Sequence, residues 1–164
     1  MTGIILFERL PGKLQSRFVR RYLGLEYPVV SDFAAEAGFR ALGPEANAAI
    51  PDLIKMLGEP LPASEPDGPS NHASSALRCI GASAIPALIA VITRTNNPSF
   101  FRVNAILALR DIAWSGNNVD AAIPGLVQCL SDPQEEVWFE AQRTLSTIAP
   151  EVLEKGGENR SKQR

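Results

Sequence analysis

The sequence predicts an all-α protein whose helical hairpins stack into a short right-handed α-solenoid. The first observation is a dipeptide that recurs at intervals of 35 and 38 residues: Ile50-Pro51, Ile85-Pro86 and Ile123-Pro124. The second is that each dipeptide opens one apolar run and follows another. Self-similarity at such a period is the signature of stacked helical repeats.

The N-terminal segment, residues 1–26, is predicted to cap the stack. Its helix over roughly 12–23 carries an apolar stripe and a separate basic cluster. A terminal repeat needs a cap with a polar outer side, which this helix provides. The alternative is that a basic amphipathic helix lies on a membrane surface or binds an acidic partner.

The repeat domain is expected over residues 27–154, with two helix types in alternation. One type spans about 31–42, 70–80, 99–113 and 134–148. Its apolar residues recur with helical spacing, as in Phe101, Ala105, Leu109 and Ile112. Gly43 and Gly81 are expected to end two of these helices.

The other helix type spans about 46–57, 83–94 and 119–131. Its prolines lie near the helix start, where a missing N–H costs no hydrogen bond. Ser83 and Asp120 are the predicted N-caps. Asn97-Pro98 and Asp132-Pro133 are turn signals between helices.

Two segments are expected to be mobile. Residues 58–71 contain four prolines and two glycines where the other turns need only a few residues, which predicts an insertion on one rim of the stack. The tail from 155 to 164 has no apolar residue and is predicted to be disordered.

Composition narrows the class of protein. The formal net charge is −2, with basic ends and an acidic region between them, which argues against wholesale wrapping of nucleic acid. The two cysteines, Cys79 and Cys129, have neither metal-ligand nor disulfide-framework spacing. We expect a cytoplasmic protein with no membrane span and no signal peptide.

Several of these residues resemble HEAT-type repeats. Leu130-Ser131-Asp132-Pro133 resembles the family's turn, and Phe101-Arg102…Ala105…Ala108-Leu109…Ile112 resembles its second helix. With Ala41-Leu42-Gly43 linking repeats, the pattern is similar to the bacterial phycobiliprotein-lyase-type repeats, across residues 31–150. The resemblance implies a protein-binding scaffold, although some members bind DNA or bilins. Ser70 and Trp138 replace the family's arginine, which argues against an Asp–Arg ladder between repeats.

A row of arginines is the first candidate binding site. Arg40, Arg78 and Arg110 each stand two residues before the last apolar anchor of a second helix, with Arg143 nearby. Equal positions in stacked repeats form a ladder, and in this family the second helices line the concave side. The alternative is a solvated face whose charge is neutralised by Glu36, Asp111 and Glu140.

An aromatic strip is the second candidate binding site. Phe33, Val103 and Phe139 occupy equivalent positions off the main buried stripe, and Trp138 is adjacent to Phe139. Exposed aromatic residues mark partner grooves, but these residues are equally expected to pack under neighbouring helices or the termini.

No arrangement of residues predicts catalysis. The single histidine, His72, adjoins the proline-rich insertion, and the sequence has neither a catalytic triad nor a phosphate-binding loop. We therefore expect a non-enzymatic scaffold, without a cofactor or metal, that binds a protein through its concave face. The alternatives are nucleic-acid binding by the arginine row and an activity of the bilin-lyase kind.

Overall fold

The computed structural model describes residues 38–60 and 69–153. These residues form helices, joined by short turns, and include no strand. After a helical stretch at 38–42 come α4 (Ile50–Leu57), α5 (Pro69–Ile80), α6 (Ile85–Ile92), α7 (Ser99–Trp114), α8 (Ile123–Cys129) and α9 (Glu135–Ile148). The all-α prediction is confirmed. The predicted cap at 1–26, the tail at 155–164 and residues 61–68 of the insertion lie outside the described residues.

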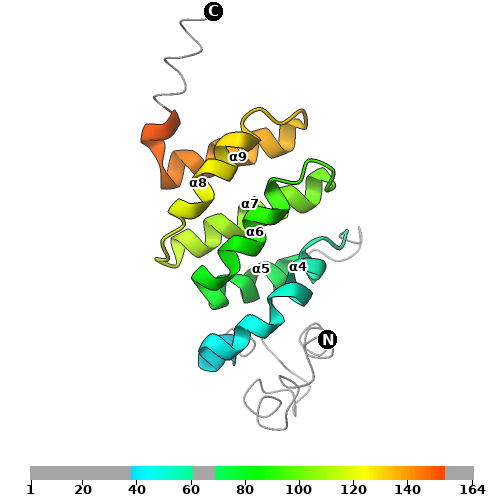
Figure 1. Cartoon of the computed structure of the whole chain (residues 1–164), viewed down its shortest axis with the longest axis vertical. Coiled ribbons are helices and arrows are strands. Elements are labelled where there is room, and N and C mark those ends of the chain that lie inside the picture. Colours follow the sequence, from blue (N-terminus) through cyan, green and yellow to red (C-terminus); the bar gives the residue numbers. More distant parts are fainter. Residues whose placement is uncertain (1–37, 61–68, 154–164) are drawn as a thin grey trace, which may run out of the picture.

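Consecutive helices pair into antiparallel hairpins that follow one another along the long axis of the molecule (Figure 1). The pairs are α4 with α5, α6 with α7, and α8 with α9. The second helices of the pairs, α5, α7 and α9, also pack directly on one another, and the shorter first helices touch less. This is the predicted alternation of two helix types. The right-handed sense of the stack stays a prediction.

Each Ile-Pro pair marks the first turn of an α-helix, but a 3-10 turn precedes it. Gly43–Ala49, Gly81–Ala84 and Asp120–Ala122 are 3-10 segments, so the α-helices begin later than the sequence predicted. The predicted N-caps are wrong, because the cap positions of α6 and α8 are Ala84 and Ala122, neither of which has a side-chain cap. Proline at the second helical position already removes one N–H that a cap would serve.

Gly81 has the conformation that the sequence predicted for a helix end. Its φ is 73°, in the left-handed region that favours glycine. A Cβ at this position would stand 2.9 Å from Asn117 Oδ1, in the turn of the next hairpin. Glycine is therefore needed here both for the backbone angle and for the approach of the neighbouring repeat.

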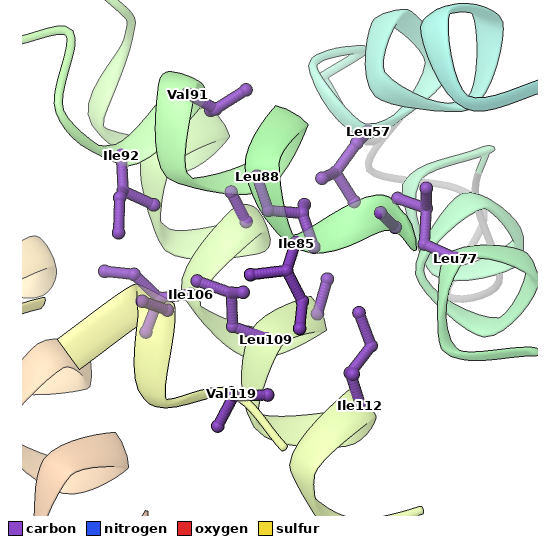
Figure 2. Close-up of a cluster of buried hydrophobic side chains, with 14 of the residues drawn as sticks. Leu57, Leu77, Ile85, Leu88, Val91, Ile92, Ile106, Leu109, Ile112 and Val119 are labelled. Carbon is purple, nitrogen blue, oxygen red and sulfur yellow. The ribbon is translucent and has the colours of Figure 1, made fainter. Parts of the chain in front are cut away.

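The core lies between the two helix layers and continues from hairpin to hairpin. Leu88 and Ile92 of α6 meet Ile106 and Leu109 of α7, as Figure 2 shows. Leu109 of α7 and Leu145 of α9 are both completely buried. Burial of a leucine side chain stabilises a fold by about 1.5–3 kcal/mol, so this continuous core holds the hairpins together.

The junction between the last two hairpins contains an Asp–Arg pair, although the sequence argued against a ladder of such pairs. Arg102 on α7 forms an ion pair with Asp132 in the turn between α8 and α9. One repeat earlier the equivalent positions hold Ser70 and Asn97, and both are uncharged. Asn97 instead donates to the carbonyl of Val91. At the junction between the first two hairpins, both members of the ion pair are thus replaced by neutral residues.

One stretch, Ser70–Ile92, is long and apolar enough to cross a membrane by length and composition alone. The chain changes from α5 to α6 within it, at Gly81 with its φ of 73°. Its two halves belong to different hairpins and supply core residues such as Leu77 and Leu88. The apolar character of this stretch is therefore explained by the core.

Candidate functional site

The second helices present one side to the first helices and the other side to solvent. On α7, Ala105 and Leu109 are buried, whereas Leu107, Arg110 and Trp114 retain exposure. We call the outward side of α5, α7 and α9 the second-helix face. The predicted arginines Arg78, Arg110 and Arg143 stand on these helices, and Arg40 is exposed in the helical stretch at 38–42.

The arginines on α7 and α9 share one acid. Glu140 of α9 lies 3.3 Å from Arg110 and 3.6 Å from Arg143, measured between guanidinium nitrogen and carboxylate oxygen. Arg110 is mostly buried, with 12% of its side chain exposed, and Arg143 is exposed. Because one carboxylate serves two guanidinium groups, this cluster keeps a net positive charge, smaller than that of an unpaired row.

Arg110 also lies over an aromatic ring. Its guanidinium carbon is 4.9 Å from the ring centroid of Trp114, one turn further along α7. Trp114 is 65% exposed, the highest fraction among the large apolar side chains in the described part of the chain. The attraction between a guanidinium and an exposed indole ring is worth about 0.5–1 kcal/mol. This attraction favours one arrangement of the two side chains.

The predicted aromatic strip is only partly exposed. Phe139 is 52% exposed on α9, whereas Val103 is half-buried against the core. Trp138 is half-buried, and its ring centroid lies 6.4 Å from that of Phe139. Phe33 lies outside the described residues. Of this strip, Phe139 is the member that offers a large apolar surface to solvent.

A cavity of about 270 Å³ lies between α5 and α7 and includes Arg110 in its wall. Its lining is mainly polar and comes from α5, α7 and the end of α4: Leu57, Ser70, Asn71, Ser74, Ser75, Asn104, Leu107, Arg110 and Asp111. Asn104 helps to close its α4 end by donating a hydrogen bond to the carbonyl of Leu57, at 3.1 Å.

Asp111 is the carboxylate of this cavity. Burial raises the pKa of Asp111 above its ordinary value, and the raising effect exceeds the lowering effects of Arg110, Arg78 and a hydrogen bond from Ser74. That hydrogen bond is long, at 3.4 Å between Ser74 Oγ and the carboxylate. The charged form of Asp111 is therefore incompletely compensated by the protein.

The segment 101–132, which runs from α7 to the turn after α8, matches the family model described as PBS lyase HEAT-like repeat. The paired helices, the Ile-Pro starts and the buried Arg102–Asp132 pair agree with this match. This segment of the chain is therefore similar to a HEAT-like repeat. No curated protein and no solved structure matches the chain.

The two cysteines lie in the core or against it. Cys129 is buried, and desolvation raises the pKa of its thiol to about 11. Cys79 is half-buried and also free of a disulfide. Within residues 38–60 and 69–153, groups of three or more histidine, cysteine or acidic side chains with metal-binding geometry do not occur.

Sequence reasoning missed Trp114 and the cavity. Trp114 lies two residues after Ile112, the last core residue of α7, and the other second helices have no tryptophan at the equivalent position. A pattern of recurring residues therefore does not include it. Its spacing of four from Arg110 was the available signal, because such pairs meet on a helix surface. The cavity had no local signal, since α5 and α7 enclose it jointly.

Proposed function

We propose that this protein is a non-catalytic HEAT-like scaffold that binds a protein partner through its second-helix face. One observation carries the proposal: Trp114, largely exposed, is held under the guanidinium of Arg110 on a helix whose other side is core. Tryptophan and arginine are the residues that most often dominate protein interfaces, and an ordered pair loses less entropy on binding.

The shape of the helix stack supports the choice of this face. The second helices pack closely on one another while the first helices touch less, and this arrangement favours a concave surface on the second-helix side. Phe139 adds exposed apolar surface on the neighbouring helix α9. The ion pair of Arg143 with Glu140 on α9 adds charged groups to the same face, and a protein interface usually has an apolar centre and a charged rim.

The experiment is a quantitative pull-down from the native host with the full chain as bait. Trp114→Ala should reduce capture of the partner about thirtyfold, since loss of an interface anchor costs about 2 kcal/mol or more. The matched control is Val127→Ala on α8, which removes an exposed apolar side chain of a first helix. Equal capture by both variants would contradict the proposal.

Binding of nucleic acid by the arginines is the second candidate function. Glu140 offsets part of the charge of Arg110 and Arg143, which supports a protein partner instead. The triple variant Arg40→Gln, Arg78→Gln, Arg110→Gln separates the two candidates. A nucleic-acid binder would bind a fluorescent duplex with an affinity that falls steeply with added salt and is lost in this variant. We expect no such binding by the unmodified chain.

An enzymatic role of the bilin-lyase kind has a direct test as well. Added bilin should leave its own absorbance spectrum unchanged in the presence of the purified protein. A shifted spectrum that persists after gel filtration would contradict the non-catalytic proposal.

A further inference from the structure

We propose that the cavity between α5 and α7 binds the carboxamide side chain of an asparagine or glutamine from a partner polypeptide. This inference rests on the proposed function, because the cavity shares Arg110 with the Trp114 surface. It adds a polar specificity site beside the aromatic anchor, and it names the chemical group that the partner must supply.

The size of the cavity favours one side chain. Sites for drug-sized ligands and cofactors usually enclose about 300–1,000 Å³ and are mostly apolar. This cavity is smaller, at about 270 Å³, and serine and asparagine side chains make up much of its wall. A short polar side chain of a docked polypeptide fits both properties.

The charge of the cavity disfavours an ionised guest. Its wall contains one cationic side chain, Arg110, and one carboxylate, Asp111. A guest carboxylate would approach Asp111, and Arg110 is already engaged by Glu140. A guest ammonium or guanidinium would face Arg110 and the charge of Arg78, which acts on Asp111. Buried charges without full compensation are costly, so the balanced wall selects a neutral guest.

The hydrogen-bonding groups specify what the neutral guest must carry. The hydrogen bond that Asp111 accepts from Ser74 is long, and a carboxylate can accept several bonds, which leaves capacity for an N–H donor. Ser75 can donate to an oxygen, and so can the Nε of Arg110, which is buried without a hydrogen-bond partner in the described chain although another nitrogen of this side chain pairs with Glu140. A primary carboxamide supplies N–H and C=O on one planar group, and an alcohol or an apolar side chain lacks one or both.

The test uses three small probes and NMR titration of the isotopically labelled full chain. The probes are N-acetylglutamine methylamide, N-acetylglutamate methylamide and N-acetyllysine methylamide. The glutamine probe should shift the amide signals of Ser74, Ser75 and Asp111 with a Kd of about 1–10 mM, as expected for a fragment with few contacts. The other two probes should bind about tenfold more weakly, because each brings an uncompensated charge.

Variants assign the effect to the cavity. Asp111→Ala should abolish the shifts, and Ser75→Leu should block the cavity by filling it. Asp120→Ala is the matched control, since it removes an exposed acid outside the cavity, and it should leave the titration unchanged. Circular dichroism of each variant establishes that the helices remain.

The outcomes separate this inference from the proposed function. Absence of shifts with the glutamine probe, equal shifts with the lysine probe, or an unaltered titration of a folded Asp111→Ala variant would overturn the carboxamide site alone. If the glutamine probe binds as expected but Trp114→Ala captures the partner normally, the cavity stands as a carboxamide site and the proposed interface fails.

Discussion

Arg102 and Asp132 form an ion pair that is almost completely buried between two successive hairpins. Their side chains are 2% and 4% exposed, and they come from α7 and from the turn that precedes α9. A buried pair of this kind fixes how one hairpin sits on the next, because each charge needs the other in place.

Removal of one member of this pair should destabilise the protein strongly. Asp132→Asn or Arg102→Met should lower the free energy of unfolding by about 3–5 kcal/mol, since each leaves an uncompensated buried charge or unpaired polar groups. The measurement is urea denaturation. The double variant should be more stable than the sum of the two losses implies, and additive losses would show that the pair does not act as a unit.

The core anchors of α7 and α9 should each carry a large part of the stability. Leu109→Ala and Leu145→Ala should each cost about 2–5 kcal/mol, because both side chains are completely buried and the truncation leaves a cavity. Urea denaturation measures the loss, with Val127→Ala as the exposed control. A loss below about half a kilocalorie per mole at both leucines would be typical of surface positions and would contradict the packing.

Asp111 should make the protein less stable as the pH rises through the carboxyl range. Burial raises its pKa in the folded state, so the folded protein holds the proton to a higher pH than the unfolded chain. The free energy of unfolding therefore loses a contribution as the pH rises from the unfolded pKa through the folded pKa.

Asp111→Asn tests this sign by removing the titration. The stability of the variant relative to the unmodified chain should increase as the pH rises from about 3 to 7, measured by thermal unfolding at fixed ionic strength. The change in relative stability should be small, because the Asp111 carboxyl is half-exposed and solvent screens its charge. Glu45→Gln reports the general effect of losing one exposed acid. A relative stability that falls over this range would mean that the carboxylate is stabilised by its surroundings.

Cys129 should be unreactive while the protein is folded. Burial raises the pKa of its thiol to about 11, and the thiolate is the reacting form. In a Cys79→Ser background, Ellman's reagent at pH 8 should modify Cys129 only at the rate of transient opening. Urea should restore the rate of a free thiol. Rapid reaction of the native variant would show that the thiol of Cys129 is accessible to solvent in the folded protein.

The repeat period made the architecture predictable. The Ile-Pro dipeptides and the anchors Leu109 and Leu145 recur at fixed offsets, and offsets of this kind arise when similar hairpins share one core. The 3-10 turns before the α-helices were missed, although two of them begin at glycines with positive φ, Gly43 and Gly81. Such turns are set by tertiary packing and leave little local signal.

The candidate site was predictable only in part, because its interactions are not periodic. Arg110 was found through its recurrence, and Glu140, thirty residues away on another helix, was among the acids expected to neutralise the row. Trp114 was missed because it occurs in one repeat alone. Recurrence reveals the residues that repeat and build the stack, and it overlooks a residue such as Trp114 that occurs once.

The interfaces between successive hairpins differ in composition, because the buried ion pair of one is replaced by neutral residues in the other. The joint between the last two hairpins has a buried ion pair, whereas the joint before it has the neutral residues Ser70 and Asn97, and the hydroxyl of Ser70 is buried without a partner in the described chain. In an array where each unit touches only its neighbours, opening begins at the weaker junction. The amide hydrogens of the α4–α5 hairpin should therefore exchange with solvent before those of α7 and α9. Local unfolding of the stack would then start at the α4–α5 hairpin and proceed towards α9.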